Sequence, residues 1–264
     1  MSVVELIAQI ESARPPLDFV GALHRSPKSY HPVAKRSGPD FGPTTGVVGV
    51  RGNCPALIAE VKKGSPSKGV MVKDFEPVRL AKTYAANGAA AISVLTDEKY
   101  FGGSLDYLRQ IAALELGVPL LRKEFICDAY QVLEARAAGA DAVLLIVAEL
   151  SDHELRVFQS QIRHLGMAAL VEVHTRHELA RALRCDATLI GINNRDLRDF
   201  TVSLDATRKL RPLIPPAITV VAESGISQRQ DVEGLNVDAV LVGEAIVRAE
   251  DVGEKVRELS GSNS

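Results

Sequence analysis

The stretch Ile58 to Gly69 reads I-A-E-V-K-K-G-S-P-S-K-G and joins an apolar strand, which begins at Ala56, to a polar loop. Residues two apart in a strand point to the same face, so Glu60 and Lys62 should stand side by side. Ionisable side chains at the end of a buried strand are costly unless they are paired or used in chemistry. We therefore expect this strand to carry catalytic charges and its loop to help hold an anionic substrate.

From Pro55 onward, short runs rich in Val, Ile and Leu alternate with helical patterns. The predicted strands are Ala56–Val61, Ala91–Leu95, Pro119–Phe125, Ala142–Ala148, Ala168–Val173, Leu189–Asn194, Thr219–Ser224 and Ala239–Gly243. The predicted helices are Pro77–Asn87, Ser104–Leu116, Asp128–Ala138, Asp152–Leu165, Arg176–Arg184, Leu204–Leu213, Gln228–Leu235 and Glu244–Leu259. Near-continuous apolar strands that alternate with helices indicate a parallel sheet, and this number of units fits an α/β fold of the (β/α)8 type, a TIM barrel. An open doubly wound sheet is disfavoured because no G-x-G-x-x-G follows the first strand.

The N-terminal part of the chain has a different composition. A helical pattern formed by Val4, Leu6, Ile7 and Ile10 is broken by two prolines at 15 and 16. Residues 25–54 are rich in Pro, Gly, Ser and Thr, and they are longer than a connection in a compact domain usually is. We predict a single barrel over residues 55–264, preceded over residues 1–54 by a helical extension and a long loop that is either mobile or wrapped on the surface.

Composition excludes several classes of protein. The 46% hydrophobic and 24% charged content of the 264 residues is that of an ordinary globular protein, and the net charge of −2 argues against a nucleic-acid surface. No run approaches 18 apolar residues, so we expect no membrane-spanning helix, and the N-terminus lacks the basic region of a signal peptide. The cysteines Cys54, Cys127 and Cys185 suit neither a disulfide framework nor a zinc site. A reducing, cytoplasmic location is the expectation.

Five of the predicted strands have ionisable or polar residues at or just after their C-terminal ends. These residues are Glu60 and Lys62, Lys123, Glu172, Asn193 with Arg195, and Glu223 with Ser224. In this type of barrel the chemistry lies at the C-terminal ends of the strands. One charged residue leaving a strand usually just enters solvent, and we expect Lys63, Lys68 and Arg122 to be solvated or paired at the surface. Lysines, glutamates and an asparagine that converge on one mouth are what proton transfer requires.

A phosphate site is predicted near the last two strands. Barrels of this type often bind phosphate between the loops after strands seven and eight. Gly225 and Gly243 stand in these loops, where they either let the main chain approach an anion or serve as ordinary turn glycines. Ser65, after the first strand, could add another donor. These residues indicate a phosphorylated small molecule without saying which one.

The chain resembles the indole-3-glycerol phosphate synthase family from Pro55 to about Ala249, with weaker similarity over Leu17–Leu23. The resemblance lies in six segments: Ile58-Ala-Glu-Val-Lys-Lys-Gly-Ser-Pro-Ser-Lys-Gly, Ser93-Val-Leu-Thr-Asp-Glu-Lys-Tyr-Phe-Gly-Gly, Leu121-Arg-Lys-Glu-Phe-Ile, Leu170-Val-Glu-Val-His, Gly191-Ile-Asn-Asn-Arg-Asp and Ala222-Glu-Ser-Gly-Ile. It implies closure of 1-(2-carboxyphenylamino)-1-deoxyribulose 5-phosphate to indole-3-glycerol phosphate in tryptophan biosynthesis, with loss of CO2 and water. No cofactor or metal is implied.

The resemblance also implies roles for the charged residues. Lys123 matches the general acid that protonates the substrate ketone, and Glu172 and Glu60 match acids that stabilise a cationic intermediate and accept a proton. Lys62 matches a lysine that binds the substrate carboxylate or serves as the acid in dehydration, and the division of steps between the two lysines stays open. Desolvation lowers the pKa of a lysine, whereas the neighbouring glutamates oppose this change.

The remaining positions concern binding. Asn193 and Glu223 match residues that hold the anilino and hydroxyl groups. The implied phosphate cradle comprises Ser65, Ser224, Gly225 and Gly243, to which we add Arg195 as a further substrate-binding candidate. The implied pocket for the aromatic ring comprises Phe101, Phe125 and Leu144. Some relatives have Ser where this chain has Glu244, and we expect that carboxylate to turn away from the phosphate.

Two other functions remain open: a different phosphate-binding barrel enzyme such as a sugar-phosphate isomerase, and a non-catalytic barrel that binds a phosphorylated ligand. An isomerase would not need Lys62 and Lys123 together with Glu172. We expect a small phosphorylated substrate and a monomer or weak homodimer, with association with other tryptophan-pathway enzymes as an option.

Overall fold

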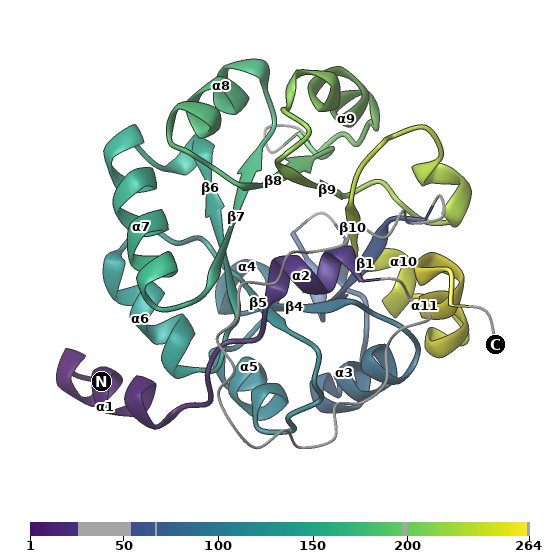
Figure 1. The fold of residues 1–264 in the computed structure, drawn as a ribbon. Coiled ribbons are helices and arrows are strands. Elements are labelled where there is room, and N and C mark those ends of the chain that lie inside the picture. Colours follow the sequence, from purple (N-terminus) through teal and green to yellow (C-terminus); the bar gives the residue numbers. More distant parts are fainter. Residues whose placement is uncertain (26–53, 67, 197–199, 263–264) are drawn as a thin grey trace.

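The computed structural model describes residues 1–25, 54–66, 68–196 and 200–262, and it forms a closed parallel barrel (Figure 1). The barrel strands are β1 (Ala56–Val61), β4 (Ala91–Leu95), β5 (Leu120–Lys123), β6 (Ala142–Ile146), β7 (Ala168–Val173), β8 (Leu189–Asn193), β9 (Thr219–Glu223) and β10 (Ala239–Val242). They pair in the order β1-β10-β9-β8-β7-β6-β5-β4, and β4 closes the ring on β1. The predicted (β/α)8 barrel is confirmed.

Strand β1 shows why these sequences form a barrel. Its residues are all buried, and they alternate between two apolar clusters. Leu57 and Ala59 pack outward in the cluster that joins the strands to the helices. Ala56 and Ile58 point inward, into a second cluster filled by other strands. Glu60, two residues after Ile58, is the next inward-facing residue, and its carboxylate therefore lies at the mouth of the barrel.

The helices surround the strands in Figure 1. They are α3 (Pro77–Ala86), α4 (Glu98–Phe101), α5 (Leu105–Ala112), α6 (Ala129–Ala137), α7 (Asp152–His164), α8 (Arg176–Arg184), α9 (Asp205–Leu210), α10 (Glu244–Val247) and α11 (Val252–Ser260), with 3-10 turns η2 (Val147–Glu149), η3 (Arg211–Leu213) and η4 (Arg229–Val232). Most begin at a side-chain cap; Asp128, for example, accepts the Tyr130 N–H.

Four local predictions were wrong or incomplete. The expected helix over Gln228–Leu235 is only the 3-10 turn η4, which ends before Gly234, a residue with φ of +74°. The expected last helix is two helices, because Asp251 caps the start of α11 through the Glu254 N–H. The loop after β1 contains an unpredicted hairpin of β2 (Gly64–Ser65) and β3 (Gly69–Val70). Helix α4 was also not predicted.

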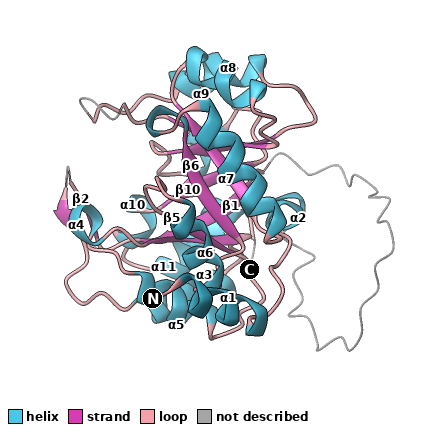
Figure 2. Ribbon diagram, turned by 90° about the vertical axis from the view of Figure 1, so that its left-hand side faces the viewer, coloured by secondary structure: helices cyan, strands magenta, loops and turns pink. Residues whose placement is uncertain are grey.

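Within residues 1–25 two helices precede the barrel, α1 (Val3–Ser12) and α2 (Phe19–His24), which confirms an N-terminal helical extension. Phe19 and Leu23 of α2 pack into the inward cluster at the start of the strands, and His24 contacts Thr219 Oγ1 at 2.9 Å. Figure 2 places α2 and strand β2 at opposite ends of the barrel. Helix α2 therefore closes the end of the barrel away from the predicted site. The prediction for the long loop lies largely outside the described residues.

Candidate active site

The C-terminal ends of the strands surround a cavity of about 650 Å³, a size that suits a small-molecule substrate. Its lining includes all but one of the predicted site residues, namely Glu60, Lys62, Phe101, Lys123, Phe125, Leu144, Glu172, Asn193, Arg195, Glu223, Ser224, Gly225 and Gly243. The exception is Ser65, which lies in hairpin strand β2 and is not part of the lining. Residues that are far apart in the sequence thus meet at one mouth, as the barrel fold predicts.

Lys123, the last residue of β5, is the centre of the charged cluster. Its Nζ lies 3.2 Å from Glu172 Oε2 and also contacts Glu223 Oε2. Asn193 Nδ2 donates to Glu172 Oε1 at 3.1 Å, which fixes the other side of that carboxylate. Four strands, β5 and the adjacent trio β7, β8 and β9, therefore supply one connected group at the floor of the cavity.

The carboxylates control the charge of Lys123. Burial alone would lower the pKa of its ammonium, but the negative charges of Glu223, Glu172 and Glu60 outweigh burial and raise the pKa. Both predicted effects on this pKa are therefore present, and the glutamates, two of which lie in direct contact with Lys123, outweigh desolvation. Lys123 is held protonated, which is the form a general acid needs before it reacts.

The two glutamates beside Lys123 differ. Burial raises the pKa of both, but for Glu172 the charges of Lys123 and His174 and the bond from Asn193 outweigh burial and lower the pKa. For Glu223 burial prevails despite Lys123, aided by repulsion from Glu172, and the pKa rises to about 7. Glu223 Oε1 is buried and has no hydrogen-bond partner among the described residues. The two environments thus favour the ionised form of Glu172 and the protonated form of Glu223.

Gly191 of β8 makes room for the Glu223 side chain. A Cβ atom at this position would lie 2.1 Å from Glu223 Oε1, far inside van der Waals contact. Any other residue would push the carboxylate away from Lys123. Gly191 was not predicted as a site residue, because its neighbour across the strands is known only once β8 and β9 are paired in register.

The Glu60–Lys62 pair predicted from strand spacing is confirmed. Lys62 Nζ lies 3.4 Å from Glu60 Oε2, and it also stands over the Phe101 ring at 5.5 Å from the centroid. A Cβ atom on Gly243 would approach Glu60 Oε2 to 2.5 Å. The absence of a side chain at Gly243 therefore makes space for the Glu60 carboxylate, a role that we had not predicted for this glycine.

The turn after β9 forms the opposite wall. Ser224 and Gly225 both have positive φ, +64° and +79°, so the chain reverses sharply at the cavity edge. Arg195 also borders the cavity, and its own N–H donates to Asn193 Oδ1 at 3.0 Å. These groups lie together where the phosphate was predicted, but Ser65 does not lie with them on the cavity wall.

Glu244 does not turn away as expected. It borders the cavity at the start of α10, where its Oε1 lies 3.9 Å from Lys68 Nζ and 3.4 Å from Arg248 Nε. Two cations beside the carboxylate offset the repulsion that it would exert on a bound phosphate. Lys68 is therefore paired across the mouth of the cavity, between the loop after β1 and the start of α10.

An aromatic wall lies beside the charged floor. The rings of Phe101, at the end of α4, and Phe125, in the loop after β5, are 6.4 Å apart. Leu144 and Ile146 of β6 continue the apolar surface. Ile146 was not predicted, although it follows Leu144 by two residues and so shares its inward face. This wall suits the flat apolar ring of an aromatic substrate.

His174 is a titratable neighbour of the cluster that was not predicted from the sequence. Its Nε2 lies 3.5 Å from Glu172 Oε1 and its Nδ1 lies 3.3 Å from Glu178 Oε2. Burial lowers its pKa, but the bond to Glu178 and the two carboxylate charges raise it overall. A signal was present, since His174 stands two residues after Glu172 on the same strand face.

The prediction that Arg122 is solvated or surface-paired was wrong. Only 4% of this residue is exposed, and its guanidinium is enclosed between β5 and α6. Alternation along β5 explains the burial, because Lys123 points into the mouth and Arg122 therefore points to the helix layer.

The described part of the chain has neither a candidate metal site nor a candidate membrane-spanning helix. No group of three or more His, Cys, Asp or Glu side chains there is arranged to hold a metal ion. Within the same residues, no helix is long and apolar enough to cross a membrane.

The fold and the site together define a barrel enzyme that moves protons on a small anionic substrate with an apolar part. The family model for indole-3-glycerol phosphate synthase matches residues 47–259, and the chain belongs to this family. It is 55% identical over 215 residues to the indole-3-glycerol phosphate synthase of Dehalococcoides mccartyi strain CBDB1, covering 80% of this chain and 83% of that protein. It is 49% identical over 267 residues to that of Roseiflexus castenholzii, covering 97% and 90%.

More distant solved structures share the fold alone. Thiamine phosphate pyrophosphorylase from Pyrococcus furiosus aligns with a TM-score of 0.59 at 21% identity, covering 77% of this chain and 93% of that one. The 3-keto-L-gulonate-6-phosphate decarboxylase from Vibrio cholerae aligns with a TM-score of 0.60 at 16% identity, covering 78% and 95%. At these identities the likeness says nothing about the reaction.

Proposed function

We propose that this protein is an indole-3-glycerol phosphate synthase that closes 1-(2-carboxyphenylamino)-1-deoxyribulose 5-phosphate to indole-3-glycerol phosphate, releasing CO2 and water. The observation that carries the proposal is the Lys123 ammonium, held by Glu172 and Glu223 at the floor of a cavity with an aromatic wall. The substrate has matching parts: an aromatic ring, a ketone that needs a proton, and a phosphate. Membership of the family supports the same conclusion.

Ring closure requires an acid at the ketone. As the aromatic carbon that carries the carboxylate forms a bond to the ketone carbon, the C=O π electrons move to oxygen, and Lys123 gives that oxygen a proton. The ring is then cationic, and loss of CO2 returns the electron pair of the carbon–carboxylate bond to it. Glu172, whose pKa is lowered despite burial because Lys123 and His174 lie beside it, can stabilise this cation.

Dehydration requires a second acid and a base. Either lysine can give a proton to the new hydroxyl, which leaves as water, while a carboxylate takes a proton from the adjacent carbon and its electrons form the indole double bond. Lys62 and Glu60 form one acid–base pair, and Lys123 and Glu172 form another. Two protons are supplied and one is accepted, so one is taken up overall, which balances the conversion of a carboxylate to CO2.

The walls would orient the substrate. The Phe101–Phe125 wall would hold the aromatic ring, Lys62 would pair with its carboxylate, and the turn at Ser224 and Gly225 with Arg195 would face the phosphate. Correct placement of this kind accelerates a reaction because the entropy of bringing groups together is lost on binding and not in the reaction step.

Location and assembly are also part of the proposal. A cytoplasmic location agrees with three free cysteines. A monomer or weak homodimer, with association with other tryptophan-pathway enzymes as an option, can be tested by sedimentation of the purified protein at several concentrations, with and without those enzymes.

The experiment that tests the function is direct. The chain contains no Trp, so indole fluorescence from the product would rise above a low protein background. We expect the signal with the carboxyphenylamino-deoxyribulose phosphate and competition by inorganic phosphate. A protein that binds the substrate without producing fluorescence would be the non-catalytic barrel. One that isomerises sugar phosphates without producing fluorescence would be the alternative enzyme.

A further inference from the structure

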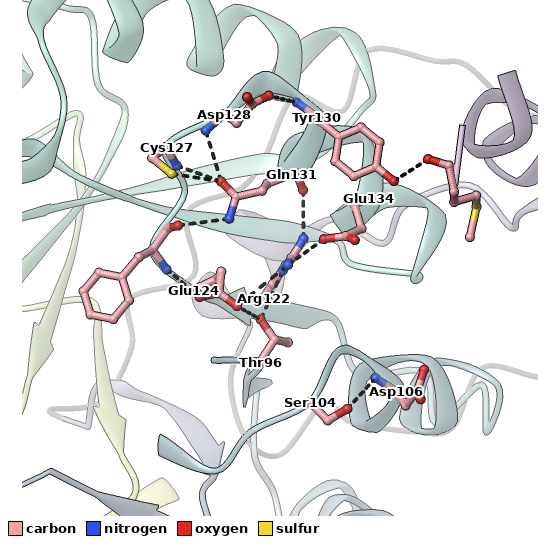
Figure 3. A network of polar contacts seen from close by, with 12 residues as sticks. Thr96, Ser104, Asp106, Arg122, Glu124, Cys127, Asp128, Tyr130, Gln131 and Glu134 are labelled. Atoms are coloured by element: carbon pink, nitrogen blue, oxygen red, sulfur yellow. Dashed lines mark hydrogen bonds and ion pairs between the residues drawn. The ribbon is translucent and has the colours of Figure 1, made fainter. Parts of the chain in front are cut away.

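We propose that a buried polar network positions the main chain of Phe125. It thereby fixes the Phe125 ring at the aryl end of the cavity, the end where the aromatic wall would hold the aromatic part of the substrate. The network consists of Thr96, Arg122, Glu124, Gln131 and Glu134 (Figure 3), and it is called the Arg122 network below. Its members come from the end of β4, from β5 and the loop after it, and from α6. The inference rests on the proposed function only for the identity of the aromatic ligand.

Arg122 connects the network. Its Nε donates to Thr96 Oγ1 at 3.1 Å, its Nη1 donates to the main-chain oxygen of Gln131 at 2.9 Å, and its Nη2 lies 2.8 Å from Glu134. A buried guanidinium is costly unless its donors are satisfied in this way. The planar group therefore fixes the end of β4 and the first turn of α6 relative to β5.

Glu124 links the Arg122 network to the main chain of Phe125. Its Oε2 accepts the Thr96 hydroxyl at 2.6 Å and lies 3.8 Å from Arg122 Nη2, while its Oε1 accepts the Phe125 N–H at 3.0 Å. One carboxylate thus links the buried guanidinium to the main chain of an aromatic residue that lines the cavity.

Gln131 holds the loop from the other side. Its Nε2 donates to the main-chain oxygen of Phe125 at 3.1 Å, and its Oε1 accepts the N–H groups of Cys127 and Asp128 at 2.8 and 3.0 Å. Residues 125–127 have no regular secondary structure, so their polar groups depend on such side-chain partners. The N–H and C=O of Phe125 are therefore both bound by this network, whereas 39% of the residue stays exposed at the cavity.

The charged floor does not depend on this arrangement. Lys123 precedes Glu124 directly, but its ammonium is held across the barrel by Glu172 and Glu223. Loosening the network should therefore misplace the Phe125 ring and leave the acid at the ketone in position. The expected signature is weaker binding of the aromatic part, with the phosphate end unaffected.

The test uses Thr96→Val, which removes the central hydroxyl and keeps the volume of the side chain. Binding of two probes to the folded protein is measured by calorimetry: anthranilate for the aryl end and inorganic phosphate for the other. The substitution removes the bond from Arg122 and the bond to Glu124, so we expect anthranilate to bind about tenfold more weakly and phosphate to bind within about twofold of wild type. The KM for the substrate should rise more than kcat falls.

Three further variants sharpen the test. Thr96→Ser restores the hydroxyl and should restore anthranilate binding, and Glu124→Gln should weaken it if Thr96→Val does not fold. Asp106→Asn is the matched control, since it breaks only the exposed 2.7 Å pair with Arg109 on neighbouring α5. Equal weakening of both probes, or wild-type binding of anthranilate in Thr96→Val and Glu124→Gln, would overturn the inference. A wild-type protein without turnover would overturn the proposed function instead.

Discussion

The raised pKa of Glu223 predicts an unusual dependence of stability on pH. Glu223 is 1% exposed, and burial raises its pKa from 4.5 to about 7. The folded protein therefore binds this proton more tightly than the unfolded chain does. Stability from this group is fully present below pH 4.5 and is lost as the pH rises through about 7. Each pKa unit is worth about 1.4 kcal/mol, so the loss should be about 3 kcal/mol, most of it between pH 5 and pH 8.

Glu223→Gln removes the titration and keeps the shape of the side chain. The free energy of unfolding is measured by urea denaturation at pH 5 and pH 8 for both proteins. The wild-type protein should lose about 2–3 kcal/mol more than the variant over this range. Comparison of the two proteins cancels the contributions of ionisable groups that lie far from Glu223.

A matched control is Glu250→Gln, at an exposed position, which should keep the wild-type dependence on pH. If wild type and Glu223→Gln lose the same stability within about 0.5 kcal/mol, then Glu223 is already ionised in the folded protein near neutral pH. That result would refute the assignment of Lys123, Glu172 and Glu223 to unequal environments.

Three further predictions concern single residues. Lys123→Ala should lower turnover by about 10²-fold or more in the indole fluorescence assay, as loss of a general acid does, and a severalfold drop would reject that role. Gly243→Ala would place a methyl group 2.5 Å from Glu60 Oε2, so activity should fall by about tenfold or more while far-UV circular dichroism stays unchanged. Arg14→Ala would leave the buried Asp141 without the ion pair that now measures 2.8 Å, which should lower the free energy of unfolding by about 2 kcal/mol. Its kcat should stay at the wild-type value because Asp141 directly precedes β6, at the end of the strand away from the site, and a large fall in kcat would contradict that separation.

Strand-level features could be predicted from the sequence because they depend on local periodicity. Short apolar runs that alternate with helical patterns located the barrel strands, and the period of two placed Glu60 beside Lys62, which the 3.4 Å contact confirms. The meeting of Lys123 with Glu172 and Glu223 was predictable once the barrel was accepted, since strand ends converge in that fold.

Features that depend on distances across the barrel could not be predicted. The pKa of Lys123 is the balance of burial against carboxylates on other strands, and its sign follows from contacts that no sequence spacing gives. Gly191 matters only because β8 lies in register with β9. Ser65 is absent from the cavity lining because its loop forms a hairpin, which short-range signals did not reveal.

On strand β5 the prediction was correct for a residue on the inner face and wrong for its neighbour on the outer face. On β5, Lys123 was assigned correctly to the mouth, but Arg122 was assigned to the surface. The residue class misled the prediction, since arginine is seldom buried without partners. Its partners Thr96 and Glu134 come from different elements, and only packing of α6 on β5 brings them together.

The central claim is that Lys123 drives a decarboxylating ring closure, and carbon balance tests it most directly. The substrate labelled with ¹⁴C in its carboxylate is incubated with wild-type protein and with Lys123→Ala; the released ¹⁴CO2 is counted, and the indole product is measured in the same samples by its fluorescence. We predict equal amounts of CO2 and indole product from wild type, both reduced about 10²-fold or more in the variant. Absence of labelled CO2 from wild type, or equal release from the variant, would contradict the claim.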